Sequence, residues 1–220
     1  MLAHQLITNT IVPLKTSDTG MLGLSLMEEY KVTHLPIVNA ETYIGLISED
    51  DIYSYNSFEE AIGGHPIANS NVSVLSEQHI YEVLEVIHEH KLTLVPVVDQ
   101  KDIYLGSILV SELAARLAEI TSITNPGGII VLLMNIHDYS LSEISQIVET
   151  NSVKILNLFV STFAESTKIE VTIKLNSVDI EPVLQTFSRY DYEVKASYTE
   201  TDLNESLTER YDSLMNYLNI

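Results

Sequence analysis

Side chains that could do chemistry lie close together at Ser48–Asp51, at His88–His90 and at His137–Asp138. In the first stretch a serine hydroxyl stands three residues before a carboxylate, and both groups can hold a polar ligand through hydrogen bonds. The same spacing also fits an ordinary helix start, where serine caps the first turn and acidic residues follow. Both interpretations are open until the surrounding elements are considered.

The two other stretches indicate neither a metal centre nor a catalytic site. His88 and His90 point to different helix faces, whereas paired ligands on one helix need i,i+3 or i,i+4 spacing, so we interpret both as solvent-facing helix residues. His137 and Asp138 could be half of a catalytic pair, but the sequence has no G-x-S-x-G motif and no G-x-x-x-x-G-K or G-x-G-x-x-G phosphate loop. With no cysteine, thiolate catalysis and Cys-ligated zinc are excluded. We predict no catalytic residue, no metal ligand and no enzymatic activity.

The charge of the chain restricts its partners. It carries 31 acidic and 11 basic residues, a formal net charge of −20, which disfavours nucleic acid as a partner because that binding depends on Lys and Arg. The hydrophobic fraction of 45% is typical of a packed globular protein. No stretch approaches the about 20 apolar residues of a membrane span, and the N-terminus lacks a signal-peptide pattern. We expect a cytoplasmic protein without membrane contact.

The chain contains an internal repeat. KVTHLPIVN at 31–39 recurs as KLTLVPVVD at 91–99, an offset of 60, and YIGLISEDDI at 43–52 recurs as YLGSILVSEL at 104–113, an offset of 61. One residue inserted in the second copy accounts for the change. Such self-similarity indicates two homologous structural units.

Each copy reads as helix, strand, turn, strand, helix. In the second copy we expect Ser76 to cap the first helix, followed by strands at 92–98 and 104–109 and a helix at 110–120. Gly20 and Gly23 weaken the first helix of the first copy. Each strand proline cannot donate to a ladder, so it belongs at an irregularity, where neighbouring backbone groups are free to meet a ligand.

The duplicated pattern over residues 5–120 resembles a tandem pair of CBS domains, also called a Bateman module. The two strands 34–38 and 94–98 and the glycine-led strands after them carry the resemblance. It implies an adenosine compound bound between the copies. In the family motif, here Gly45 to Asp51, the carboxylate of Asp51 would accept from both ribose hydroxyls and Ser48 would serve ribose or phosphate. The backbone beside Leu35 and Pro36 would contact the hydrogen-bonding edge of adenine.

The resemblance therefore implies a first nucleotide site and a weaker second one. The second copy has Leu109 in place of the hydroxyl residue and Glu112 in place of the aspartate, so we expect one competent site. The basic residues expected near the cleft are few, namely Lys15, Lys31 and Lys91, and the acidic Glu49 and Asp50 crowd the motif. This balance favours adenosine, AMP or S-adenosylmethionine over free ATP unless a divalent cation accompanies it. No cofactor is required. The first site would comprise Thr10, Val12, His34, Leu35, Pro36, Ser48 and Asp51, and the second Val95, Pro96, Leu109 and Glu112.

A different organisation follows the boundary TSITNPGG at 121–128. We predict strands at 129–136, 153–163, 168–176 and 192–200. Helices begin at Ser140, in a capping box with Glu143, and at Asp179, with Pro182 in the first turn. The apolar face of the first of these helices is expected to include Leu141. The order strand-helix-strand-strand-helix-strand is a split βαβ or ferredoxin-like unit.

This unit resembles an ACT domain, and the domain order resembles acetoin-utilisation accessory-type proteins. The resemblance implies an amino-acid site at Asn135 and Asp138, or a dimerisation domain, with Ser140 standing where the family has glycine. Residues 202–220 predict an amphipathic helix that packs on its own domain or on a partner subunit. We thus expect a mixed α+β and α/β chain with CBS repeats at 1–61 and 62–122 (each about β-α-β-β-α), an ACT-like domain at 127–200 and a C-terminal helix at 202–220.

Two functions are compatible with these patterns. The first is a ligand-sensing regulatory protein, a homodimer, in which the ACT-like domain relays binding of an adenosine compound to an unknown client protein. The alternative is a non-catalytic structural or dimerisation protein that binds a partner protein without a small ligand.

Overall fold

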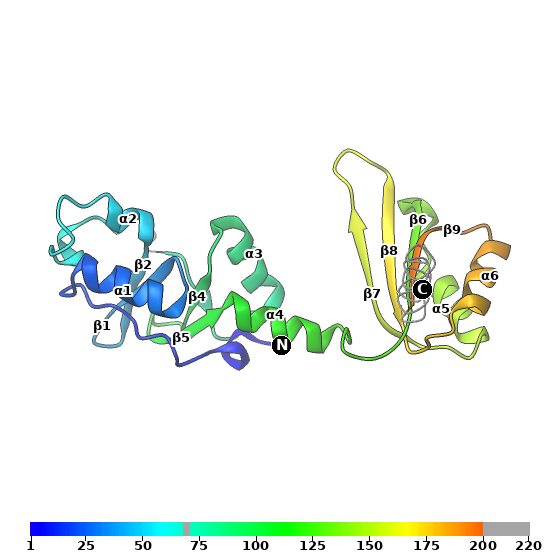
Figure 1. Ribbon diagram of the computed structural model, residues 1–220, viewed down its shortest axis with the longest axis horizontal. Helices are drawn as coiled ribbons and strands as arrows, with labels where there is room; N and C mark the ends of the chain where they lie inside the picture. The colour runs from blue at the N-terminus through cyan, green and yellow to red at the C-terminus, as the bar shows by residue number, and fades with distance from the viewer. Residues whose placement is uncertain (68–70, 200–220) are drawn as a thin grey trace, which may run out of the picture. The chain divides into compact units, whose positions relative to one another are not determined.

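The computed structural model describes residues 1–67 and 71–199. The chain forms two compact units, Met1–Arg116 and Leu117–Ile220 (Figure 1). Within the described ranges, no helix has the length and apolar content to span a membrane. The helix expected at 202–220 lies outside the described residues.

The first unit repeats one order of elements twice, as the sequence predicts. Short elements precede the main ones: the 3-10 helices η1 (Ala3–Leu6) and η2 (Ile62–Gly64) and strand β3 (Val74–Leu75). The first copy consists of α1 (Gly20–Tyr30), β1 (His34–Asn39), β2 (Thr42–Ser48) and α2 (Glu49–Tyr53). The second consists of α3 (Ile80–His90), β4 (Leu94–Val98), β5 (Tyr104–Leu109) and α4 (Val110–Ile120).

The first helices of the two copies begin at equivalent positions, but the N-cap of α3 is not the residue predicted. The N-cap of α1 is Thr19, and that of α3 is His79, whose ring accepts from the Tyr81 N–H at 3.3 Å. The prediction of Ser76 as the cap is wrong, because the Ser76 N–H donates to the Val98 carbonyl at 2.9 Å. Ser76 thus belongs to the backbone pairing of β3 with β4 and not to the helix.

Each hairpin bends just after its proline. β1 pairs antiparallel with β2, with Pro36 opposite Leu46, and the register shifts between Ile37 and Val38. β4 pairs antiparallel with β5, with Pro96 opposite Ser107, and the register shifts between Val97 and Val98. The expectation of a strand irregularity at the prolines is confirmed.

A further segment joins each hairpin on its other side in parallel. Leu14 bridges Ile37 in the first copy, and Val74 pairs with Val97 in the second, again 60 residues later. Before it reaches the first copy, the chain lies on the second: Thr8 bridges Ser107, and the Ala3 N–H donates to the Gln78 carbonyl at 2.9 Å.

Two glycines let α1 lie close to α2. A Cβ on Gly20 or on Gly23 would stand 2.9 Å from a methyl carbon of Ile52, closer than real Cβ contacts. Ile52 itself is fully buried. The cost in helix propensity is therefore offset by packing that a larger residue would prevent.

The two copies meet in a symmetric pair of backbone hydrogen bonds. The Tyr43 N–H donates to the Asp102 carbonyl, and the Tyr104 N–H donates to the Glu41 carbonyl, each at 2.8 Å. Tyr104 holds the place of Tyr43 in the repeat, as Asp102 holds that of Glu41. Val38, Tyr43 and Val98 form a buried cluster there, with Tyr104 packed against it.

The second unit is a four-stranded antiparallel sheet with two helices on one side (Figure 1). Its strand order is β7-β8-β6-β9, which is the ferredoxin-like arrangement predicted from the sequence. Burial alternates along β8, as expected for a strand with one exposed face. The elements are β6 (Ile129–Asn135), η3 (Ile136–Asp138), α5 (Leu141–Thr150), β7 (Ile155–Thr162), β8 (Lys168–Leu175), α6 (Glu181–Arg189) and β9 (Glu193–Tyr198).

Three details of this unit differ from the prediction. Ser140 caps α5 through the Glu143 N–H at 3.4 Å, but the Glu143 carboxylate accepts from the Tyr192 hydroxyl at 2.8 Å instead of closing a capping box. Leu141 is 51% exposed and lies outside the core. Asp179 does not cap α6, whose N-cap position is Ile180 without a side-chain bond.

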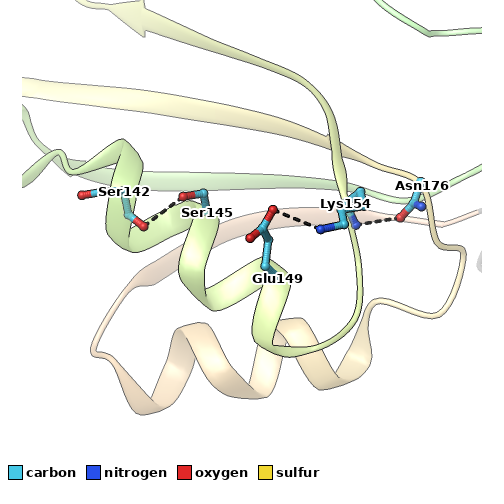
Figure 2. Close-up of polar contacts among 5 residues, drawn as sticks. All are labelled: Ser142, Ser145, Glu149, Lys154 and Asn176. Carbon is cyan, nitrogen blue, oxygen red and sulfur yellow. Dashed lines mark hydrogen bonds and ion pairs between the residues drawn. The ribbon is translucent and has the colours of Figure 1, made fainter.

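Polar contacts fix the loop between α5 and β7. Figure 2 shows the Lys154 ammonium beside the Glu149 carboxylate, at 3.1 Å, and the Lys154 N–H donating to Asn176 Oδ1 at 2.8 Å. Within α5, the Ser145 hydroxyl donates to the Ser142 carbonyl at 2.9 Å. The loop is thereby tied both to the helix before it and to the chain just after β8.

Candidate functional site

The stretch Ser48–Asp51 forms a compact hydrogen-bonded pair where β2 ends and α2 begins. The Asp51 N–H donates to Ser48 Oγ at 3.0 Å, and Asp51 Oδ2 accepts from the Ser48 N–H at 2.9 Å and from the Ser48 hydroxyl at 2.6 Å. The helix-start interpretation is therefore correct for both residues. Asp51 Oδ1 accepts no hydrogen bond from the described residues, so one carboxylate oxygen is held in place with its acceptor capacity unused.

His34 lies beside this pair in a half-buried position. It stands opposite Ser48 in the β1–β2 register, and its Nδ1 is 2.9 Å from the Thr33 hydroxyl. Burial lowers the pKa of His34 below its ordinary value, although the negative charges of Asp51 and Asp50 act in the opposite direction. A neutral imidazole can both donate and accept a hydrogen bond, so it can contact an uncharged ligand edge.

A pocket of about 370 Å³ opens between the two copies at this point. We call it the inter-repeat pocket. Its volume lies within the range of about 300–1,000 Å³ typical of small-molecule sites. It is lined by Thr33, His34, Ser48, Glu49 and Asp50 from the first copy and by His90 and Lys91 from the end of α3 in the second.

The strand proline Pro36 leaves the backbone carbonyl of Val12 without a hydrogen-bond partner. The Leu14 N–H donates to the Pro36 carbonyl at 2.8 Å, and the Val38 N–H donates to the Leu14 carbonyl at 2.7 Å. A parallel ladder would continue with a bond from residue 36 to the Val12 carbonyl, but Pro36 has no N–H. The Val12 carbonyl accepts no bond within the described part of the chain, and Val12 is 56% exposed. The carbonyl of Pro36, by contrast, is not free.

The structure brings only some of the predicted first-site residues to the pocket. His34 and Ser48 line it, and Asp51 is bonded to Ser48. Leu35 is fully buried opposite Ile47, so its side chain belongs to the core. Thr10 is exposed, with its hydroxyl 2.9 Å from that of Thr8.

Two lining residues, Thr33 and His90, were not predicted from the sequence. Lys91, Glu49 and Asp50 were expected near the cleft but were not assigned to the site. Thr33 and Lys91 belong to the repeated phrase, so the repeat itself carried a signal for them. His90 was interpreted as a solvent-facing helix residue, and it is exposed, but it also lines the pocket. Within the described ranges, no group of histidine and acidic residues is arranged to hold a metal ion.

The second copy lacks an equivalent arrangement. Val95 and Pro96 are buried, Leu109 is half-buried and offers no hydroxyl, and Glu112 is exposed in the first turn of α4. A pocket of about 580 Å³ in this copy is lined by none of these four residues. It lies instead at Leu75, Ser76, Glu77, Gln78, Glu82, Asp99, Gln100 and Lys101.

The second unit has a pocket of about 340 Å³ where an amino-acid site was expected. Asn135 and Asp138 line it together with Glu143 and Tyr192. Burial and the hydrogen bond to Glu143 raise the pKa of Tyr192 to about 12, so its hydroxyl remains a donor. No lysine or arginine is among the lining residues, so the pocket offers acceptors to an ammonium group but no cation to a carboxylate. The full lining is Leu133, Met134, Asn135, Asp138, Glu143, Tyr190, Asp191, Tyr192 and Glu193.

Two homologous lobes with a polar pocket between them define a tandem module, and a comparison with protein families identifies its domains. The model of the CBS domain matches residues 6–57 and again residues 66–119. The chain therefore carries a tandem pair of CBS domains.

Solved structures with a similar fold include other CBS pairs. A CBS domain pair/ACT domain protein from Thermotoga maritima is 18% identical, with 54% of this chain and 98% of that chain covered and a TM-score of 0.49. AcuB, assigned to acetoin utilization in Vibrio cholerae, is 24% identical, with 57% and 98% covered and a TM-score of 0.48. CBSX2 in complex with AMP is 20% identical, with 54% and 97% covered and a TM-score of 0.48.

Proposed function

We propose that this chain is a regulatory protein that senses an adenosine compound bound between its CBS domains. The observation that carries the proposal is the inter-repeat pocket, which is lined by both copies and includes Ser48, to which the Asp51 carboxylate is hydrogen-bonded. A ligand there would contact both copies at once. It would therefore favour the relative arrangement of the copies to which it binds more tightly.

The polar groups at the site suit a nucleoside. Asp51 Oδ1 can accept from a ribose hydroxyl, and Ser48 keeps the carboxylate in position through the capping contacts. The Val12 carbonyl can accept from the exocyclic amine of adenine. Thr10, His34 and the backbone at Leu35 and Pro36 complete the proposed first site, and Val95, Pro96, Leu109 and Glu112 would form the weaker second one.

The charges around the pocket favour a ligand with little negative charge. Lys91 is the only lysine or arginine among its lining residues, whereas Glu49 and Asp50 are both acidic. Free triphosphate would meet these carboxylates, and its repulsion would outweigh the attraction of one lysine unless a divalent cation accompanied it. Adenosine and AMP fit better, and the cationic sulfonium of S-adenosylmethionine fits the acidic side.

The second unit would act as an ACT-like domain that relays the ligand signal to a client protein in a cytoplasmic homodimer. Its ferredoxin-like strand order supports this assignment. The pocket at Asn135 and Asp138 has acceptors for an ammonium group, so amino-acid binding there is a subsidiary proposal. The domain limits 1–61, 62–122 and 127–200 and a terminal helix at 202–220 belong to the same proposal.

A binding panel with a matched pair of variants tests the nucleotide site. The panel contains adenosine, AMP, S-adenosylmethionine, and ATP with and without Mg²⁺, and it is measured by thermal shift and calorimetry. We expect at least one compound to raise the midpoint of thermal unfolding. Asp51→Ala should abolish this rise, whereas Glu112→Ala, at the equivalent place in the second copy, should retain it. The proposal would be overturned if no compound raised the unfolding midpoint, or if Asp51→Ala showed the same rise as the wild type.

A specific surface supports the alternative of a ligand-free interaction protein. β7 is an edge strand of the second sheet, and Phe159 and Val160 on it and Phe163 just beyond it are 54%, 40% and 44% exposed. An exposed edge with large apolar side chains is suited to pairing with another chain. Flat thermal shifts together with a stable partner complex that Phe159→Ser disrupts would favour this alternative.

A further inference from the structure

Each strand proline leaves one backbone carbonyl without its ladder partner. The parallel pairing is equivalent in the two copies, with Leu14 beside Ile37 and Val74 beside Val97. The bond missing at Pro36 would have reached the carbonyl of Val12, and the bond missing at Pro96 would have reached that of Val72. The two carbonyls therefore hold equivalent places, 60 residues apart.

In the second copy this carbonyl is occupied by a side chain of the first. The Tyr43 hydroxyl donates to the Val72 carbonyl at 2.6 Å, and Tyr43 and Val72 are only 7% and 8% exposed. Burial raises the pKa of Tyr43 well above its ordinary value, so the hydroxyl stays protonated and keeps donating. A ligand that needed the Val72 carbonyl would have to displace a buried hydrogen bond, which is costly.

The tyrosine that could reach the Val12 carbonyl of the first copy is Tyr104 of the second copy, and its hydroxyl is held elsewhere. The Tyr104 hydroxyl pairs with Ser107 Oγ at 3.0 Å and makes no hydrogen bond to Val12. Ser107 is fully buried and holds the place of Leu46 in the first copy, opposite the strand proline. Leu46 has no polar group, so Tyr43 lacks such a local partner and reaches across to Val72. The difference between serine and leucine thus accounts for the difference between the tyrosines.

We propose that Tyr43 closes the second nucleotide site, while Ser107 keeps the first open by retaining Tyr104. This inference rests on the proposed function, since it assumes that the adenine edge is read by the carbonyl beside each proline. It makes Tyr43 and Ser107 specificity-determining residues for the number of ligands per chain. Neither residue need touch the ligand bound in the first site.

Ligand counting on the full-length protein tests the proposal. Native mass spectrometry and calorimetry with adenosine, AMP and S-adenosylmethionine should give one ligand per wild-type chain. We expect Tyr43→Phe to gain a second, weaker binding event, because the Val72 carbonyl becomes open while Leu109 and Glu112 still replace the hydroxyl and the aspartate. Tyr104→Phe, the matched control, should keep one ligand. A single ligand in Tyr43→Phe would overturn the closure.

A second pair of variants tests the role of Ser107. Ser107→Ala removes the partner of the Tyr104 hydroxyl, which should then turn to the Val12 carbonyl and weaken the first site about tenfold. Ser107→Ala combined with Tyr104→Phe should restore the affinity, and circular dichroism checks that both variants fold. Unchanged affinity in Ser107→Ala would overturn this step. Two equivalent ligands on the wild type would overturn the inference alone, whereas no binding by any compound would overturn the proposed function and the inference with it.

Discussion

The backbone N–H of Thr33 donates to Thr93 Oγ1 at 2.9 Å, which joins residues that hold the same place in the two CBS domains. Their hydroxyl oxygens are 3.3 Å apart. Thr33 also lines the inter-repeat pocket, so this contact lies where a ligand would bridge the copies. The stability of the two packed CBS domains and the shape of the inter-repeat pocket should therefore depend on the same residues.

Thr93→Val should destabilise the first unit by about 1 kcal/mol, since it leaves the Thr33 N–H without its acceptor. Thr33→Val keeps that N–H and loses only hydroxyl contacts, so it should cost less. Chemical unfolding of both variants measures the difference. Equal losses would show that the hydroxyl contacts, and not the backbone donor, hold the copies together.

Lys91→Ala should weaken AMP binding by about two- to fivefold, because it removes the only lysine or arginine that lines the inter-repeat pocket. Adenosine, which lacks the phosphate, should bind both proteins equally. Lys31 is the matched control: it holds the same place in the first copy but pairs with Glu28. Calorimetry with both ligands checks this, and an equal loss for adenosine would exclude a phosphate contact.

Gly23→Ala should destabilise the protein by about 1–3 kcal/mol although alanine favours helices, because its Cβ would stand 2.9 Å from Ile52 Cδ1. Adding Ile52→Val removes that methyl carbon and should recover part of the loss. Gly64→Ala, where no atom lies within 4 Å of the added Cβ, should be close to neutral. Thermal unfolding compares the three, and a stabilised Gly23→Ala would contradict the packing argument.

Acidification should destabilise the first unit through His34. Its folded pKa lies below the ordinary value of 6.5, so between the two values the unfolded chain binds more protons and the free energy of unfolding rises with pH. This contribution is fully present above pH 6.5 and is lost as the pH falls toward the folded pKa. NMR titration of the His34 ring should give the lowered pKa.

The control for this prediction is a pair of glutamine variants. His34→Gln should reduce the difference in unfolding free energy between about pH 7.5 and pH 5.5, whereas His88→Gln, at an exposed position of α3, should not. A ring pKa above 6.5 would instead mean that the carboxylates of Asp50 and Asp51 outweigh burial.

The repeat, the hairpins and the ferredoxin-like order could be predicted from the sequence because long apolar runs and their periodicity determine them. The helix caps could not all be predicted. Ser76 has the better capping side chain, but the pairing of β3 with β4 takes its backbone, and the ring of His79 accepts in its place. Asp179 does not cap α6 either, because that helix begins after Ile180. At Ser76, tertiary pairing overrode local preference.

The pocket lining was harder to predict than the strands. Ser48 belongs to the short motif at the start of α2, but His90 and Lys91 come from a helix end of the other copy. Helical periodicity says which face a residue occupies, not which distant segment lies opposite. The contact from Tyr43 to Val72 is of the same kind, since its partners are 29 residues apart and belong to different copies.

The segment that leads into the first CBS domain hydrogen-bonds to the second one, through Ala3, Thr8 and their neighbours. Expression of the two halves as separate fragments would therefore separate this leading segment from the second CBS domain, to which it bonds. The second half alone would expose the side of β5 that this segment covers. The first half alone would carry the segment without the strand to which it bonds. We therefore expect neither half to be stable without the other.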